Sequence, residues 1–424
     1  MVHEAPGWPV DGGYRAWLST FGAWWAMFIT FGWVNSLGVF QSFYEQNLLK
    51  DYSPSAIAWI ASVQQCLTYS AGIILGKVFD DYGPRGLLIA GGFAQVFGLM
   101  MTSISNDYYQ IFLSQGICSA LGASAVMYGT VGALATWWKV RRATAYGIAI
   151  SGSSVGGVVF PILVNCLIPK VGFEWTMRAV AFIILFGAVL AVATIRSNKA
   201  HIPTSFGIWA YIKPLRDTKL SLLCVAMTLF GFGLFLPFNF IPLAAQAAGM
   251  SWELSIYSIV VLNAASIFGR ILPGFLADKF GRFNMMTICT TVSAVLTLAV
   301  WLPANNNAAS LSFAAFFGFF SGCYISLSPA LVVEVSPPSE IGHRTGILYF
   351  CISIGVLTGS PIAGALIEID GGEYQYLKTF AGVTMLAGAL LISALSFYVS
   401  IITAKAKHET SMSIMHGDSK KQAQ

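Results

Sequence analysis

Twelve apolar runs constrain this chain more than any other feature. A helix that crosses a bilayer needs about 20 mostly apolar residues. A polar stretch at 196–219 separates six runs from six more. The runs lie near residues 17–40, 56–76, 87–105, 110–136, 144–167, 175–195, 220–247, 254–276, 284–303, 309–333, 344–367 and 378–403. The sequence therefore predicts an all-α membrane protein with twelve transmembrane helices in two six-helix bundles.

The composition agrees with that class and argues against others. Charged residues make up 10% of the 424 residues, against about 25% in a soluble domain, so most of the surface should face the lipid bilayer. The net charge is +5 without a basic block, which argues against a nucleic-acid partner. All seven cysteines lie in apolar runs without CxxC spacing, so we expect no metal site. With no nucleophile–base pair at bilayer depth, we expect neither an enzyme nor a cofactor, and no obligate protein partner.

One charged string occurs twice in this otherwise apolar chain. Residues 76–85 read "GKVFDDYGPR", and residues 274–283, 198 positions later, read "GFLADKFGRF". Gly, Asp and Gly occupy the first, fifth and eighth positions of both strings. A repeat in register is expected of a duplicated transporter bundle, so the two halves should be pseudo-symmetric.

The distribution of charge predicts the topology. We expect an N-terminal tail, a first bundle, a linker, a second bundle and a C-terminal tail at residues 1–16, 17–195, 196–219, 220–403 and 404–424. With both termini in the cytoplasm, 18 of the 23 Lys and Arg residues fall on the cytoplasmic side and four outside. That split follows the positive-inside rule. The polar C-terminal tail is predicted to lack regular structure.

The repeated string resembles the cytoplasmic loop signature of the major facilitator superfamily. This resemblance implies the major facilitator fold, in which two bundles rock about a central site and open alternately to each side. It also implies a plasma-membrane location. In the family, the loop aspartate helps to lock the inner gate with basic residues and helix ends. The gating residues that the resemblance implies here are Asp80, Arg85, Arg141, Arg142, Asp278, Arg282 and Arg344.

Three further strings resemble the monocarboxylate transporters, specifically the monocarboxylate-transporter-like proteins of fungi. They are "DGGYRAW" at 11–17, "RRATAYGIAISGSSVGG" at 141–157 and "IGHRTGILYFCISIGVLTGSPIAGAL" at 341–366. Their residues also suggest local roles. Asp11 is expected to cap the first helix, and the glycines of the two longer strings should let neighbouring helices approach closely.

Arg270 is the strongest candidate for binding substrate, because ionisable residues inside a membrane span usually serve a function. A guanidinium binds a carboxylate through two parallel hydrogen bonds. The position of Arg270 also matches the arginine that monocarboxylate transporters use for the substrate carboxylate. The alternative is that Arg270 extends toward the headgroups or pairs with Asp278 or Glu334. Further candidates for the substrate site are Asn35, Asn263, Ser266 and Tyr349.

The sequence departs from the monocarboxylate pattern at two of these positions. Ser266 stands where the family has an aspartate, and Asn35 stands where it has a lysine. Those family side chains serve proton and anion coupling, so simple lactate–proton symport is not expected. Asn35 can donate hydrogen bonds but cannot carry a proton. Proton coupling is therefore an implication of the resemblance alone.

Two functions fit the sequence. One is a secondary active transporter that exports a larger acidic metabolite or secondary metabolite, and the other is an uptake carrier for a monocarboxylate or vitamin-like nutrient. Amides, hydroxyls and aromatic rings around one arginine favour the larger acidic cargo. A transporter-like sensor is disfavoured, because the tails and the linker are short. The direction of transport does not follow from the residues.

Overall fold

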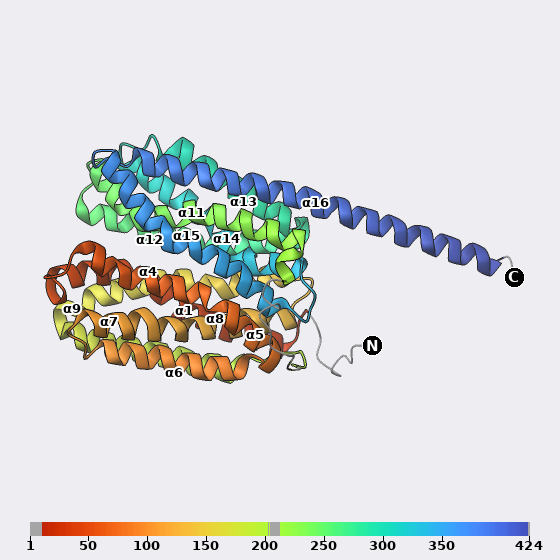
Figure 1. Cartoon of the computed structure of the whole chain (residues 1–424), viewed down its shortest axis with the longest axis horizontal. Coiled ribbons are helices and arrows are strands. Elements are labelled where there is room, and N and C mark those ends of the chain that lie inside the picture. Colours follow the sequence, from red (N-terminus) through yellow and green to blue (C-terminus); the bar gives the residue numbers. More distant parts are fainter. Residues whose placement is uncertain (1–10, 202, 204–212, 423–424) are drawn as a thin grey trace.

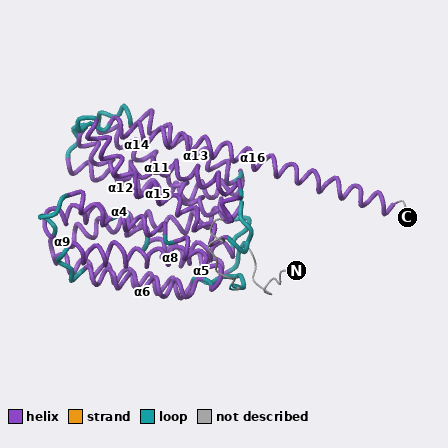
Figure 2. Tube along the Cα trace, in the orientation of Figure 1, coloured by secondary structure: helices purple, strands orange, loops and turns teal. Residues whose placement is uncertain are grey.

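The computed structural model describes residues 11–201, 203 and 213–422 of the chain. These residues form helices joined by loops and turns, without a β-strand among them (Figure 2). Helices from the first part of the chain make one layer, and helices from the second part make another layer beside it (Figure 1).

The first layer begins at Tyr14. It consists of α1 (Tyr14–Ile29), α2 (Phe31–Val34), α3 (Leu37–Phe43), the π-helix η1 (Tyr44–Leu48), α4 (Pro54–Ser70), α5 (Gly72–Tyr82), α6 (Pro84–Thr102), α7 (Tyr108–Ile111), the π-helix η2 (Phe112–Ser119), α8 (Ala120–Trp137) and α9 (Arg142–Thr194).

A short 3₁₀ helix, η3 (Lys213–Arg216), precedes the second layer. That layer consists of α11 (Thr218–Ala247), α12 (Trp252–Phe280), α13 (Arg282–Leu296), the π-helix η4 (Thr297–Trp301), α14 (Asn307–Glu334), α15 (Ile341–Ile369) and α16 (Gln375–Gln422).

Twelve spans result from these elements, as predicted. Ten of the described helices are long and apolar enough to cross a membrane. One of them, α9, holds two spans, because Gly172 adopts a φ of 80° and reverses the chain inside it. The remaining span is the first, which is divided among α1, α2, α3 and η1. The prediction of an all-α membrane fold is confirmed.

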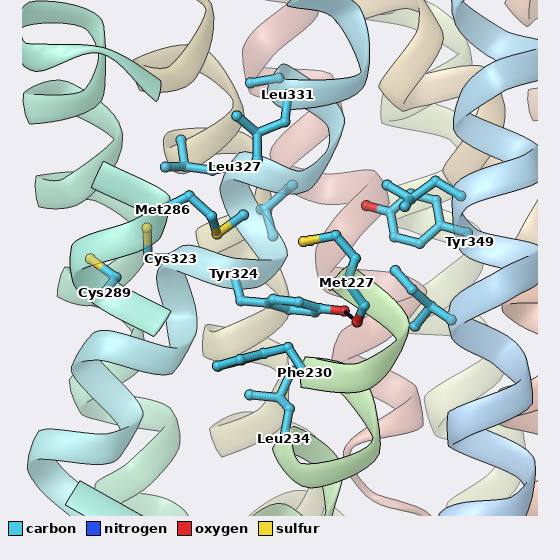
Figure 3. Packing of buried hydrophobic residues seen from close by; sticks show 14 of the residues in the cluster. Met227, Phe230, Leu234, Met286, Cys289, Cys323, Tyr324, Leu327, Leu331 and Tyr349 are labelled. Carbon is cyan, nitrogen blue, oxygen red and sulfur yellow. Dashed lines mark hydrogen bonds between the residues drawn. The ribbon is translucent and has the colours of Figure 1, made fainter. Parts of the chain in front are cut away.

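The outer surface suits a hydrocarbon solvent. Large apolar side chains point outward from both layers, and Phe93 and Phe397 are each 71% exposed. The interior is also apolar but carries occasional hydroxyls with fixed partners. In the second layer, the Tyr324 hydroxyl donates a 2.5 Å hydrogen bond to the Met227 carbonyl, and its ring stacks on Phe230 (Figure 3). Such pairing is required because a buried hydroxyl without a partner is costly.

Glycines make the tight turns of the repeated string. Gly83 has a φ of 79° and Gly281 a φ of 97°, a region that residues with a Cβ rarely adopt. Each glycine ends one long helix and begins the next, at the α5–α6 and α12–α13 junctions.

Two local predictions are wrong. Asp11 does not cap α1, since one carboxylate oxygen accepts backbone hydrogen bonds from Lys139, Val140 and Arg141 at 2.6, 2.6 and 3.1 Å. Asp11 therefore holds the loop that leads into α9. The C-terminal tail was predicted to lack regular structure, but α16 continues as a helix to Gln422 and projects beyond the layers (Figure 1).

Candidate functional site

The two charged strings lie at one end of the molecule, here called the signature end and defined by Asp80 and Asp278. Both aspartates lie in the last turn of their helices, α5 and α12. Each aspartate contacts the start of a helix in the opposite half.

Asp80 caps α15. Its carboxylate oxygens accept hydrogen bonds from the backbone N–H groups of Gly342 at 3.1 Å and His343 at 2.8 Å. The first N–H groups of a helix have no partner within the helix, and the positive end of the helix dipole attracts a carboxylate. Asp80 of the first half therefore holds the second half.

Asp278 makes the matching contact in the other direction. Its carboxylate accepts from the backbone N–H groups of Ala143 at 3.0 Å and Thr144 at 2.8 Å, and from the Thr144 hydroxyl at 2.8 Å. These residues begin α9 of the first half. The sequence repeat thus becomes a reciprocal pair of helix caps across the contact between the halves.

The predicted arginine partners are arranged differently from expectation. Arg344 does not approach Asp80, since it pairs with Asp217 at 2.7 Å and Glu340 at 3.0 Å. Arg282, the first residue of α13, contacts Asp278 of α12 at 3.4 Å and donates to the Lys139 carbonyl of the first half at 2.8 Å.

The other predicted gating arginines serve the loops of the signature end. Arg142 donates to the Trp138 carbonyl at 2.8 Å, and Arg141 gives its backbone N–H to Asp11. Arg85 is exposed in the first turn of α6. Asp80 and Asp278 each contact a helix end of the opposite half, and among the described residues no arginine–aspartate ion pair joins the two halves.

Glycines allow α5 and α15 to touch along a seam, defined by Gly72, Gly76, Gly342 and Gly346. A Cβ added to Gly76 would lie 2.1 Å from the Gly342 carbonyl oxygen, and one added to Gly346 would lie 2.0 Å from the Gly72 oxygen. Real Cβ atoms do not approach so closely, so only glycine fits this seam. The halves are therefore in backbone contact at the signature end.

Arg270 is buried between the halves, with 2% of its surface exposed. It lies ten residues before the end of α12 at Phe280, or about 15 Å along the axis at the usual helical rise. Its Nη1 donates to the Ile150 carbonyl at 2.8 Å and contacts the Ser153 hydroxyl. Its Nε has no hydrogen-bond partner among the described residues.

The alternative roles for Arg270 are not seen in this state. Within the described part of the chain, no carboxylate lies within ion-pair distance of its guanidinium. Asp278 and Glu334 contact Arg282 instead, at 3.4 and 3.7 Å. A buried cation with only neutral partners is costly, so binding of an anion beside Arg270 would be favourable.

Three other predicted residues meet the same stretch of α9, residues 150–157. Asn35 donates to the Ser153 carbonyl at 3.3 Å, and the Ser266 and Ser154 hydroxyls are 2.6 Å apart. Asn263 packs against Gly157.

The Oδ1 atom of Asn263 is buried without a hydrogen-bond partner among the described residues. Four of the five predicted substrate residues thus converge on α9: Asn263, Ser266 and Arg270 reach it from the opposite layer, and Asn35 reaches it from the same layer.

Tyr349 lies apart from that group, where α15 packs against α4. Its ring packs against Tyr69 with centroids 5.6 Å apart. Tyr69 was not predicted as a site residue, because an aromatic residue in an apolar run usually packs in the core. An open pocket of about 310 Å³ lies elsewhere, lined by residues such as Phe173 and Trp175, and touches none of the predicted substrate residues.

The linker supplies functional candidates that the sequence analysis missed. Lys199 Nζ donates to the Pro338 carbonyl of the second half at 2.9 Å. His201 Nδ1 lies 3.0 Å from the Asp80 carbonyl of the first half, and its Nε2 lies 2.8 Å from the Ser197 hydroxyl. A carbonyl can only accept, so Nδ1 carries the proton. The linker thus bridges both halves beside the Asp80 cap.

Two linker groups have shifted pKa values. Burial lowers the pKa of His201 below its ordinary 6.5, and the Lys199 charge lowers it further against an opposing bond to the Asp80 carbonyl. For Asp217, burial alone would raise the pKa, but the hydrogen bond and charge of Arg344, with the Lys219 N–H, outweigh it and lower the pKa below 3.8.

Comparisons with known proteins agree with this architecture. The family model described as Major Facilitator Superfamily matches residues 16–317 and 263–413. The MFS transporter asaE of Aspergillus flavus is 45% identical over 391 residues, which cover 92% of this chain and 88% of the relative. The Fujikurins efflux protein of Gibberella fujikuroi is 42% identical over 385 residues, 91% of this chain and 83% of the relative. The Aspyridones efflux protein apdF of Emericella nidulans is 38% identical over 386 residues, 91% and 78% of the two chains.

Solved structures with little sequence identity share the fold. The transporter FucP, in an outward conformation, superimposes with a TM-score of 0.71 at 12% identity, covering 89% of this chain and 98% of its own. The human organic anion transporter MFSD10 gives a TM-score of 0.71 at 11% identity with the same coverage. The expectation of a transporter rather than an enzyme is confirmed by the family match. On its fold, its reciprocal caps and these matches, the chain belongs to the Major Facilitator Superfamily.

Proposed function

We propose that the chain exports small acidic secondary metabolites across a membrane by alternating access, with Arg270 binding the acidic group. The observation that carries this proposal is the environment of Arg270. Its guanidinium is buried between the halves, has neutral partners, and keeps Nε without a hydrogen-bond partner among the described residues. A carboxylate or enolate would pair side-on with Nε and an Nη group.

Export is favoured over uptake by the relatives. Two chains that are 42% and 38% identical to this one are named as efflux proteins, for fujikurins and for aspyridones. The three strings that resemble the fungal monocarboxylate-transporter-like proteins support membership of that branch. The substitutions at Asn35 and Ser266 support a cargo larger than lactate.

The state described is closed at the signature end. In our proposal, transport alternates between this state and one in which the Asp80 and Asp278 caps and the glycine seam have separated. Asn35, Asn263 and Ser266 would then be freed from α9 to meet the cargo. Cytoplasmic termini, a plasma-membrane location and proton coupling belong to the same proposal, and the distribution of Lys and Arg supports the orientation.

Flux in liposomes tests the proposal. Purified protein would be reconstituted with a pH dye inside, and uptake of a labelled acidic metabolite would be followed together with the dye, with empty liposomes subtracted. We expect Arg270→Gln to abolish flux and Arg270→Lys to restore little of it, since a lysine cannot form the two parallel bonds.

Arg178→Gln is the matched control. Arg178 lies in α9, and its contacts stay within the first layer: Glu174 at 3.7 Å, the Ser103 hydroxyl at 3.2 Å and the Trp175 ring at 4.9 Å. Its loss should therefore leave flux unchanged. Flux that survives Arg270→Gln would refute the proposed site. Flux without a dye response would leave export standing and remove proton coupling.

A further inference from the structure

Five aromatic rings meet where the halves touch, immediately past the glycine seam. We call them the aromatic cluster: Phe31, Tyr69, Tyr128, Phe235 and Tyr349. The first three come from the first half and the others from the second. Centroid distances are 5.3 Å from Tyr69 to Phe31, 6.1 Å to Phe235 and 5.6 Å to Tyr349, and 6.1 Å from Tyr349 to Tyr128. The cluster therefore forms part of the contact between the two moving halves.

Two hydroxyls in the cluster lack the partners that other buried tyrosines have. Tyr128 donates to the Tyr69 carbonyl at 2.7 Å, Tyr324 donates to a backbone carbonyl, and Tyr44 donates to a glutamine side chain. Tyr69 and Tyr349 are 5% and 4% exposed, and in the described part of the chain neither hydroxyl takes part in a hydrogen bond. Figure 3 shows the Tyr324 bond as a dashed line and labels Tyr349 on the neighbouring helix α15.

Phenol oxygens that the protein leaves unbonded can donate to a ligand. The Tyr69 and Tyr349 rings pack against each other from opposite halves, and neither oxygen belongs to the fully buried polar atoms without a partner among the described residues, so both border accessible space. Arg270 is close enough to Tyr69 for the two to interact electrostatically. A cavity that opens between the halves at the aromatic cluster would therefore offer aromatic faces, the hydroxyls of Tyr69 and Tyr349 as donors, and the Arg270 cation.

We propose that the aromatic cluster is the substrate subsite for the planar, conjugated part of an acidic metabolite. This inference rests on the proposed function and adds a substrate class, an aromatic or enolic acid that carries further oxygen acceptors. The Tyr69 and Tyr349 rings would lie on its two faces. Their hydroxyls would donate to its oxygens, and Arg270 would bind its acidic group.

The geometry requires only a small opening. A planar group between two rings needs about 7 Å between their centroids, two carbon contacts of roughly 3.5 Å each. Since the ring centroids are 5.6 Å apart and the ring planes are inclined by 31°, the halves need to separate by about 1.5 Å beside the two tyrosines while the rings turn parallel. A planar ligand would then hold one tyrosine of each half, so its binding and the movement of the halves are coupled.

The test measures binding of two matched probes to the full-length purified protein. 3-Hydroxy-2-naphthoate is planar and carries both a carboxylate and a hydroxyl. Decalin-2-carboxylate has a similar size and charge but is saturated and not planar. Binding would be measured by titration calorimetry for the wild type and for Tyr69→Phe, Tyr349→Phe and Tyr349→Leu.

We expect naphthoate to bind at least tenfold more tightly than the decalin acid. Each phenylalanine variant should lose about three- to tenfold for naphthoate, the range for one hydrogen bond, and Tyr349→Leu should lose most of the preference for the planar probe. Tyr44→Phe is the matched control, because the Tyr44 hydroxyl already bonds to Gln115 inside the first half. It should leave the preference unchanged.

Thermal unfolding supplies a second readout without ligand. Tyr349→Phe should unfold at the wild-type temperature, since no internal bond is lost, whereas Tyr44→Phe should unfold at a lower one. Equal binding of the two probes, or full naphthoate binding by both phenylalanine variants, would overturn the inference. If the decalin acid is then still transported and its transport depends on Arg270, the proposed export function is retained and only the aromatic subsite is wrong. If neither probe binds or is transported, the subsite and the export function are both wrong.

Discussion

The carboxylate of Asp278 accepts two hydrogen bonds from Thr144, one from the backbone N–H and one from the hydroxyl, both at 2.8 Å. The two residues are 134 positions apart and belong to opposite halves of the protein. Asp80 makes the pseudo-symmetric contact with His343. Closure at the signature end is therefore maintained by two helix caps, and their energies can be tested separately.

Removal of either cap should favour separation of the halves. Asp278→Ala or Asp80→Ala should cost the closed state about 2 kcal/mol, as expected for a charge-assisted cap. Spin labels at Tyr82 and Phe280, which are 71% and 65% exposed at equivalent helix ends, would report the distance between the halves. We expect that distance to increase in either variant.

The control for this prediction is Asp370→Ala. Asp370 accepts from the N–H groups of Gln375 and Tyr376 at 2.8 and 3.1 Å, so it also caps a helix, but within one half. It should lower stability without changing the label distance. An unchanged distance in both the Asp80 and Asp278 variants would show that the caps do not hold the halves closed.

The glycine seam should tolerate no side chain. A Cβ at Gly342 would lie 2.4 Å from the Gly76 carbonyl oxygen, so Gly342→Ala should destabilise the closed state by about 1–3 kcal/mol through overpacking. Hydrogen exchange of α5 and the start of α15 should become faster. Gly364→Ala in the same helix has open space around its Cβ and should instead stabilise by about 0.5–1 kcal/mol. Similar responses from the two variants would mean that the seam is not a tight contact.

Docking of the linker should depend on pH through His201. Burial lowers its pKa below 6.5 in the docked state, so the docked state prefers the neutral ring. A group with a depressed pKa contributes full stability above its unfolded pKa and loses it as the pH falls. Protection of residues 196–201 from hydrogen exchange should therefore be highest above pH 6.5 and decline below it.

His201→Asn offers the matched control, because the asparagine amide can replace Nδ1 as donor to the Asp80 carbonyl but does not titrate. Its protection factors should lack the decline between about pH 8 and pH 5 that the imidazole causes in the wild type. The same decline in both proteins would assign the pH dependence to another group.

Asp11 should stabilise the start of α9 rather than α1. One oxygen accepts from three consecutive N–H groups, those of Lys139, Val140 and Arg141. Asp11→Ala should lower the free energy of unfolding by about 1–2 kcal/mol. Hydrogen exchange should become faster at 139–145 and stay unchanged at 14–20; the opposite pattern would restore the cap on the first helix that the sequence suggested.

The sequence by itself determined the number of spans and the equivalence of the halves. Apolar runs of about 20 residues have few alternatives to a membrane helix, because every backbone polar group must be satisfied inside the hydrocarbon. The repeated string located Gly83 and Gly281 at turns, where only a residue without a Cβ adopts the observed φ readily. These features depend on local composition and spacing, which the sequence contains directly.

Only the tertiary structure decided which side chains meet. Asp80 and Asp278 were recognised from the sequence, but their partners are backbone N–H groups, which every residue type except proline supplies. For the same reason Asp11 was assigned to the nearest helix instead of one 130 positions away. Contacts between distant helices depend on how the two halves pack.

The same packing places Tyr349 against Tyr69 and apart from Arg270. A tyrosine in an apolar run looks the same whether or not its hydroxyl finds a partner. Whether it does depends on which carbonyls and side chains the opposing helix brings within about 3 Å, and that is fixed only when the halves close.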